Sequence, residues 1–186
     1  MNENIIKRNK LLAEKVIKGL ESRNMTGYYA ETAEEALQKA LSIIPEGATV
    51  TMGGGMSVHE IGLVKALADA GIEVYTDHIR LHAETAKGGV MEAHCAIADL
   101  GSIVQLSDDI DARIIAVMPE YCIGVVRLSE MVDDYDAMFD KLCSLEKLPA
   151  FVGFIPGPSR TADIECVSTV GVHGPLKLSV VVIKDV

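Results

Sequence analysis

Two turns near the C-terminus place a cation and a histidine where they could bind an anion. The first turn ends at Ser159, which is expected to be the N-cap of a short helix over 160–166. Arg160 would then lie at the positive end of the helix dipole, where a cation is unfavourable unless a negative group neutralises it. That group could be a bound carboxylate or phosphate, or an internal carboxylate such as Asp163 or Glu165.

The second turn, GVHGP, holds His173 between Gly171 and Gly174, directly before an apolar run. The backbone of a tight turn, and not a helix face, would present this side chain. Open α/β sheets bind ligands at strand ends, so we expect one ligand site shared by both turns and by the glycine loop Gly53–Gly55. The alternative is a structural salt bridge combined with a tight turn.

The glycine loop follows a short β-branched run and precedes a helix. Glycine lets the backbone approach a ligand closely, and free N–H groups at a helix start favour an anion. A dinucleotide fingerprint needs a third glycine where Val58 stands, although Asp77 has the place of the ribose-binding acid. The loop therefore predicts a site for another anionic or acyl ligand, with a tight turn capped by Ser57 as the alternative.

Two candidates for a catalytic base follow that loop. His59 would lie in the first helical turn, where the dipole disfavours protonation and keeps the imidazole neutral. Glu60 stands three residues after Ser57, and this spacing predicts a capping box that already employs its carboxylate. His173 is the third candidate, and catalytic residues stay unassigned among the three.

The histidines and cysteines show no spacing typical of a metal centre or a cofactor. His78 and His82 would share a helix face, but the Glu of the metalloprotease motif is missing between them. The four cysteines are widely separated and lack any iron–sulfur spacing, which predicts reduced, structural thiols and a chain without clusters. They are Cys95, Cys122, Cys143 and Cys166. We expect no metal and no cofactor.

Composition excludes several classes of partner. The 186 residues carry a formal charge of -10, with 49% hydrophobic and 24% charged residues, which is typical of a globular chain. Affinity for nucleic acids and for anionic membranes rests on clustered Lys and Arg, so neither partner is expected. No apolar leader or membrane span is evident, and the sequence predicts a cytoplasmic protein.

The first half of the chain predicts helices around a βαβ unit. Apolar spacing indicates an N-terminal helix over 4–23, and Thr32 with Glu35 forms a capping box for the next helix. The strand 48–52 leads through the glycine loop into a helix over 57–70 and a strand over 72–77. A helix broken at Gly88-Gly89 is expected within 77–93.

The second half predicts mostly strands, at 95–98, 102–106, 113–119, 123–128, 150–156 and 176–183, interrupted by a helix over 133–146. Continuous apolar runs indicate strands covered on both faces. We therefore expect a single α/β domain over 1–186, three-layered, Rossmann-like and mostly parallel, with the helix in residues 1–24 packed on it. Strand 48–52 should be central, with the glycine loop at its C-terminal end.

Four stretches together resemble a known family. IPGPSRTADIECVSTVGVHGPLKLSVVVI closely resembles the C-terminal signature of the LUD domain, the family of lactate utilization protein C. PEGATVTMGGGMSVHEIGL, AIADLGSIVQL and RIIAVMPEYCIGVV agree with the same family, so the resemblance covers residue 45 to the C-terminus. It implies a fold similar to the ribose-5-phosphate isomerase, glucosamine-phosphate deaminase and CoA-transferase group. It also implies a role in oxidation of L-lactate to pyruvate, alongside partner proteins that carry iron–sulfur clusters.

The resemblance transfers motif positions and no assigned catalytic residue. Leu100 departs from the family, in which many members have Thr before Gly101. The positions expected to contact a ligand are Gly53, Gly54, Gly55, Ser57, Gly101, Ser102, Gly157, Ser159, Arg160, Thr161, Asp163, His173 and Gly174, and Glu60 and Pro158 match the motif as well.

Three functions remain open from the sequence. The first is an accessory subunit of lactate utilization that binds a small organic acid or iron–sulfur partner proteins. The second is a stand-alone enzyme of the isomerase or CoA-transferase type acting on a phosphorylated or CoA-linked small molecule. The third is a pure interaction module, and homo-oligomerisation is open in each case.

Overall fold

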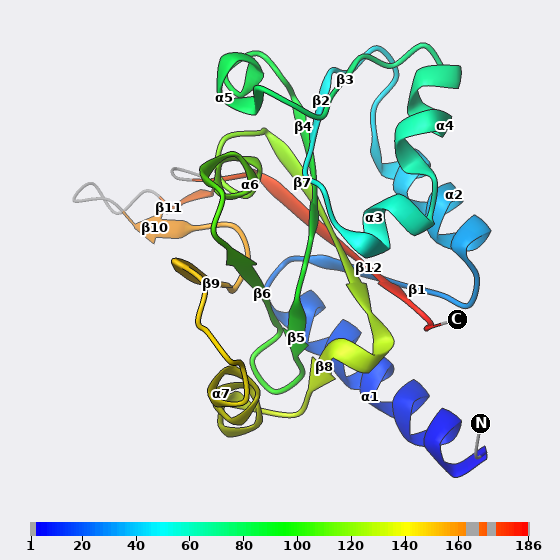
Figure 1. Cartoon of the computed structure of the whole chain (residues 1–186), viewed down its shortest axis with the longest axis vertical. Coiled ribbons are helices and arrows are strands. Elements are labelled where there is room, and N and C mark those ends of the chain that lie inside the picture. The colour runs from blue at the N-terminus through cyan, green and yellow to red at the C-terminus, as the bar shows by residue number, and fades with distance from the viewer. Residues whose placement is uncertain (1–2, 163–167, 171–173, 186) are drawn as a thin grey trace.

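The architecture is that of a computed structural model, which describes residues 3–162, 168–170 and 174–185. Within these ranges the chain forms the helices and strands that Figure 1 shows. The helices are α1 (Glu3–Ser22), α2 (Ala33–Ile43), α3 (Met56–Glu60), α4 (Leu63–Asp69), α5 (Ile79–His82), α6 (Ile110–Ile115), η1 (Leu128–Glu130) and α7 (Tyr135–Cys143). None of the described helices combines the length and apolarity that a membrane crossing requires.

A six-stranded parallel sheet forms the centre of the molecule, in the order β1-β12-β7-β4-β2-β3. Its strands are β1 (Thr26–Ala30), β2 (Val50–Met52), β3 (Val74–Tyr75), β4 (Gly88–Glu92), β7 (Tyr121–Arg127) and β12 (Lys177–Ile183). The predicted α/β fold with a mostly parallel sheet is confirmed. The predicted strand 48–52 lies inside the sheet as β2, one strand from the edge, while β12, β7 and β4 occupy the middle.

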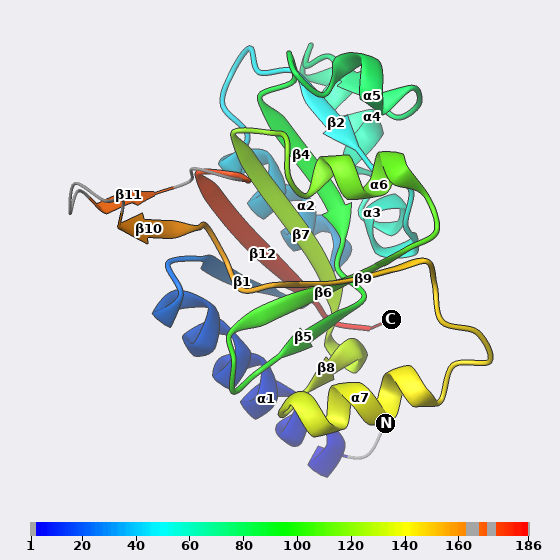
Figure 2. The same cartoon turned by 90° about the vertical axis from the view of Figure 1, so that its left-hand side faces the viewer.

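A second sheet crosses one face of the first and was not expected from the sequence. It has the order β8-β5-β6-β9, from β5 (Cys95–Ile97), β6 (Ser102–Ser107), β8 (Met131–Val132) and β9 (Phe151–Ile155). Figure 2 looks onto this face, with α6 above the crossing strands and with α1 and α7 below them. The hairpin of β10 (Arg160–Ala162) and β11 (Ser168–Val170) extends away from the body in both views.

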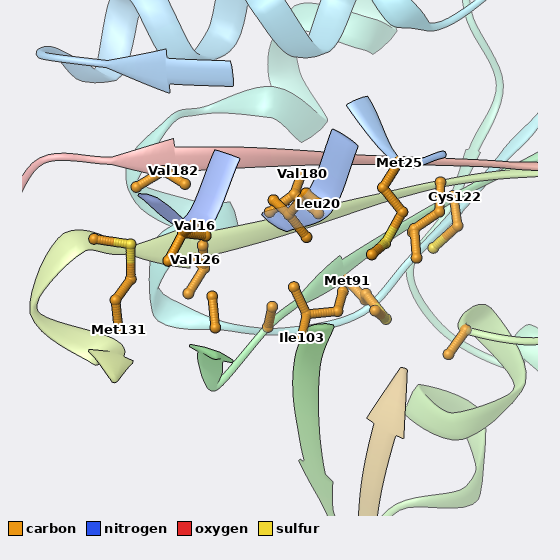
Figure 3. Packing of buried hydrophobic residues seen from close by; sticks show 14 of the residues in the cluster. Val16, Leu20, Met25, Met91, Ile103, Cys122, Val126, Met131, Val180 and Val182 are labelled. Atoms are coloured by element: carbon orange, nitrogen blue, oxygen red, sulfur yellow. The ribbon is translucent and has the colours of Figure 1, made fainter. Parts of the chain in front are cut away.

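Alternation along the buried strands builds two cores on the two faces of the main sheet. On β7, Ile123 and Val125 pack with α2, α3 and α4, whereas Cys122 and Val126 pack with α1, α6 and the second sheet. Figure 3 shows the core that contains Val126, in which Val16 and Leu20 of α1 take part. The strands are thus buried on both faces, which explains their continuous apolar sequences.

Three predicted elements differ from the structure. Residues 113–119, expected as a strand, form the end of α6 and a turn, because a short apolar run fits a buried helix as well as a strand. The helix over 57–70 is divided into α3 and α4 at Gly62, whose φ of 66° is left-handed. Within 77–93, the expected helix is limited to the short α5, and Gly88-Gly89 begin the inner strand β4.

Candidate functional site

An internal carboxylate lies at the glycine loop where a ligand anion was expected. Glu92, the last residue of β4, accepts hydrogen bonds from the Ser57 N–H at 3.0 Å and from the Ser57 hydroxyl at 2.7 Å. Gly55 makes this approach possible, because a Cβ on that residue would lie only 2.1 Å from Glu92 Oε2. The first turn of α3 therefore already has a negative partner in the folded chain.

Arg127 extends this arrangement into a network at the carboxyl ends of β2, β4 and β7. Its Nε donates to Ser57 Oγ at 3.2 Å, and its guanidinium forms a salt bridge with Glu60. The predicted capping box is wrong, because Ser57 bonds to Glu92 and not to the backbone of Glu60. Ser57 and Glu60 thus hold α3 against the sheet, and an ion-paired Glu60 is less suited to the role of a general base.

An acidic cavity of about 560 Å³ opens beside this network. Gly53 and Gly54 contribute to its wall, and so do the segments after β3, β4 and β6. We call it the acidic cavity because its charged lining consists of the carboxylates Asp77, Glu92, Asp108, Asp109 and Asp111, together with the histidines His78 and His94. Such a lining repels an anionic ligand.

The imidazole of His94 is half-buried in the wall of the acidic cavity. Burial lowers the pKa of His94, and this effect outweighs the nearby Glu92 carboxylate, which acts in the opposite direction. Its Nδ1 lies 3.3 Å from the backbone N–H of Leu106 and accepts this hydrogen bond. The neutral ring therefore carries its proton on Nε2.

The other histidines of this region are separated from one another. His78 precedes α5 in a left-handed conformation with a φ of 48°, while the His82 ring stacks on Tyr75 at a centroid distance of 3.6 Å. His59 is exposed, and its Nε2 would lie 4.0 Å from a Cβ atom added to Gly54. Among the described residues, no group of three His, Cys, Asp or Glu side chains could hold a metal ion.

A second cavity, of about 440 Å³, brings together the two C-terminal turns. Gly157 and Pro158 contribute from one turn, and Gly174 and Pro175 from the other. The rest of the lining is mostly apolar, and we call it the apolar cavity: Gln105, Arg113, Ala116, Val117, Phe151, Gly153, Phe154, Ile155, Pro156 and Leu178. Both turns thus contribute to one cavity, whereas Gly53 and Gly54 of the glycine loop line the other, and a ligand site at the two turns stays a prediction.

Two polar side chains interrupt this apolar lining. Arg113, in the last turn of α6, lies over the Phe151 ring at 5.2 Å, and its buried Nε has no hydrogen-bond partner among the described residues. Gln105 of β6 is 2% exposed, and its Oε1 is likewise unpartnered there. Buried polar atoms normally have partners, so these two atoms mark where a ligand could bind.

The remaining predicted positions lie apart from both cavities or outside the description. Gly101 packs against Gly19 of α1, and neither Gly101 nor Ser102 lines either cavity. Ser159 borders a smaller hollow with Arg23. Asp163 and His173 lie outside the described residues.

The predicted helix after Ser159 is wrong at its start. Arg160 and Thr161 belong to strand β10, in which Arg160 pairs with Val170. Two prolines and a glycine precede this strand, and the sequence signal for an N-cap also fits a turn into a hairpin. The dipole argument for an anion at Arg160 therefore does not hold, and its ligand contact stays a prediction.

Glu92, His94, Gln105 and Arg113 were not predicted from the sequence as site residues. Two signals were present: Gln105 interrupts an apolar strand, and Asp109 is an N-cap four residues before Arg113. The Asp109 side chain accepts from the Asp111 N–H at 3.1 Å and thereby starts α6. Glu92 and His94 had no local signal, because their roles depend on contacts with distant segments.

Comparisons with known proteins agree with this architecture. The LUD domain matches residues 13–183. The chain is 30% identical over 165 residues to the protein YkgG of Escherichia coli, covering 84% of this chain and 71% of that protein. It is 34% identical over 134 residues to a lactate utilization protein C of Halalkalibacterium halodurans, covering 68% and 58% respectively. The chain thus spans little more than half of the latter relative's length.

A solved structure is similar to the whole described fold. The crystal structure of a DUF162 family protein from Deinococcus radiodurans aligns with a TM-score of 0.68, covering 94% of this chain and 98% of that one. The sequence identity is 17%, so the likeness concerns the fold alone. Similarity to the isomerase, deaminase and CoA-transferase group stays a prediction.

Proposed function

The chain belongs to the LUD domain family, and from this premise we propose that it is a component of lactate utilization that binds a small organic acid in the apolar cavity. Relatives that are 30–34% identical to this chain carry the name lactate utilization protein C. One observation supports the choice of cavity: the buried Nε of Arg113, which has no hydrogen-bond partner among the described residues, lies in a mostly apolar wall.

A carboxylate suits this wall because an arginine offers it charge-assisted hydrogen bonds in a fixed planar geometry. Within the described residues, Arg113 has no salt bridge with a carboxylate, whereas Arg127 pairs with Glu60 and Arg80 with Asp111. The apolar remainder of the cavity fits the short hydrocarbon part of such an acid. The acidic cavity is the less suitable place, since its carboxylates oppose an anion.

Oxidation of lactate to pyruvate removes two electrons and two protons, and a further component must accept the electrons. We propose that partner proteins with iron–sulfur clusters do so, and that this chain binds the acid beside them. The four widely spaced cysteines of the sequence support this division, because iron–sulfur centres need clustered thiolates. This division of roles is tested by purifying the tagged chain and identifying iron–sulfur proteins that copurify with it. Deletion of the partner genes should abolish this copurification.

Binding of L-lactate to the unmodified chain and to Arg113→Gln tests the site. We expect calorimetric affinity to fall about tenfold or more in Arg113→Gln, the loss expected for a hydrogen bond to a charged group. Arg80→Gln is the matched control, because Arg80 pairs with Asp111 outside the apolar cavity and its side chain is 64% exposed. Equal affinities in all three proteins, or no binding to any, would refute the proposal. A large stability loss in Arg113→Gln with unchanged affinity would show an internal partner instead.

A further inference from the structure

The apolar cavity contains two unpartnered polar groups of opposite kinds. Arg113 Nε can only donate a hydrogen bond, and Gln105 Oε1 can only accept one. Both side chains line the apolar cavity, Gln105 lies in the wall between it and the acidic cavity and lines both, and neither atom has a partner among the described residues. A ligand that satisfies both must therefore bring an acceptor to the arginine and a donor to the glutamine.

The hydrogen bond made by the amide nitrogen of Gln105 shows which atom of the amide is left without a partner. Gln105 Nε2 donates to the backbone carbonyl of Ala112 at 2.8 Å. A carbonyl oxygen can only accept, so the amide cannot be turned over without placing two acceptors against each other. The atom left without a partner is therefore an acceptor, in a side chain that is 2% exposed.

A carboxylate with a neighbouring hydroxyl has the complementary pattern. From the geometry of this cavity, we propose that Gln105 selects 2-hydroxy acids over the corresponding 2-oxo acids. The carboxylate accepts from Arg113, and the 2-hydroxyl donates to Gln105 Oε1. The apolar lining, which includes Phe151 and Leu178, takes the short alkyl group. This inference rests on the proposed function, since it needs the acid to occupy this cavity.

The oxo acid is disfavoured for a specific reason. Its 2-oxo oxygen is an acceptor, so in the same pose it would face the amide oxygen of Gln105, and neither atom would obtain a hydrogen bond. An acid with no group at the 2-position avoids this contact but still leaves the glutamine unpaired. A buried group left unpaired costs binding free energy, and sites built around such groups discriminate strongly.

Three acids of equal chain length separate these effects. Binding of L-lactate, pyruvate and propionate to the unmodified protein is measured by calorimetry at one pH and ionic strength. We expect lactate to bind about tenfold more tightly than propionate, and pyruvate to bind no better than propionate. Equal affinities for lactate and pyruvate would overturn the selection by Gln105 but leave the proposed function intact. Absence of binding by all three acids would overturn both.

The same substitution at two different glutamines tests whether the preference for lactate depends on Gln105. Gln105→Met removes the amide at nearly constant size, and we expect the preference for lactate over pyruvate to fall to within about twofold. Gln38→Met is the control, because Gln38 is an exposed residue of α2 that bonds to Glu34, and its preference should match that of the unmodified chain. A lactate preference that persists in Gln105→Met would assign selection to another residue and overturn the inference. The three-acid comparison decides the matter by itself if Gln105→Met does not fold.

Discussion

The variant Gly55→Ala adds one methyl group to the glycine loop and tests whether a glycine is needed there to make room for the Glu92 carboxylate. In Gly55→Ala the new Cβ would lie 2.1 Å from Glu92 Oε2, 2.6 Å from its Cβ and 2.9 Å from its Cδ. Real Cβ atoms do not approach other atoms so closely, so Glu92 or the loop must move. The φ of Gly55 is -172°, which alanine also adopts, so backbone strain is not the cause of any effect.

The magnitude follows from the bonds that Glu92 would lose. Its carboxylate accepts from the Ser57 N–H and hydroxyl, and a hydrogen bond to a charged group contributes about 1.5–3 kcal/mol. Part of that contribution is recovered if the displaced carboxylate reaches water. We therefore expect the free energy of unfolding to fall by about 3 kcal/mol, which lowers Tm by roughly 6–12 °C for a chain of this size.

The neighbouring residue provides the control. In Gly54→Ala the nearest side-chain atom to the new Cβ is His59 Nε2 at 4.0 Å, an ordinary contact, so the free energy of unfolding should change by less than about 0.5 kcal/mol. Urea unfolding followed by circular dichroism measures both variants. Gly55→Ala should also cost less in a Glu92→Ala background, where no carboxylate remains to be displaced. Equal stability of Gly55→Ala and Gly54→Ala would refute the explanation.

Two further predictions concern titration and thiol reactivity. Burial lowers the pKa of His94, so the unfolded chain binds this proton more readily, and the free energy of unfolding should decrease as the pH falls below about 6.5. His94→Gln should weaken this pH dependence, and a pH dependence in His94→Gln equal to that of the unmodified chain would contradict the assignment. Burial raises the pKa of the Cys95 thiol to about 11 and that of Cys122 to about 12, whereas Cys143 is exposed. Iodoacetamide at pH 8 should modify Cys143 and spare the two buried thiols until denaturant is added, as peptide mass spectrometry would show; labelling of Cys95 in the native protein would refute their burial.

Local sequence signals predicted those elements whose local and tertiary preferences agree. Thr32 accepts from the Glu35 N–H at 3.1 Å, and the Glu35 carboxylate accepts from the Glu31 N–H at 2.8 Å, so the expected cap starts α2 as predicted. The buried strands β7 and β12 were evident because their apolar sequences are continuous. In these segments no distant contact competes with the local pattern.

Misassignments occurred where a distant residue takes over a local role. Ser57 has the spacing of a capping box with Glu60, but Glu92, 35 residues later in the chain, binds the Ser57 hydroxyl. Arg127 then pairs with Glu60, 67 residues away. Contacts at such separations have no periodic trace in a single sequence, and for the same reason the second sheet was not predicted.

The sequence predicted one part of the geometry around the apolar cavity but not the residues that give it polar groups. Gly157 and Gly174 do meet at one cavity, as their turn sequences suggested. Arg160 drew attention because a helix was assumed after Ser159, and the strand β10 removes that reason. Arg113, which faces the same cavity, was hidden because the apolar residues of α6 read as a strand.

The distribution of charge decides which cavity an anion would enter. Glu92 already provides a negative partner at the start of α3, and it is one of five carboxylates that line the acidic cavity. Within the described residues, Arg80 is the only arginine or lysine that forms a salt bridge with any of them. A chain with a formal charge of -10 repels anions at long range, so binding one requires a local cation that is not neutralised by its own carboxylates. Arg113 lines the apolar cavity and meets this requirement, since it has no salt bridge among the described residues and lies in a mostly apolar wall. The Glu92 carboxylate thus takes the place of an anion at the glycine loop, and Gly157 and Gly174 line the cavity in which we propose that a small acid binds.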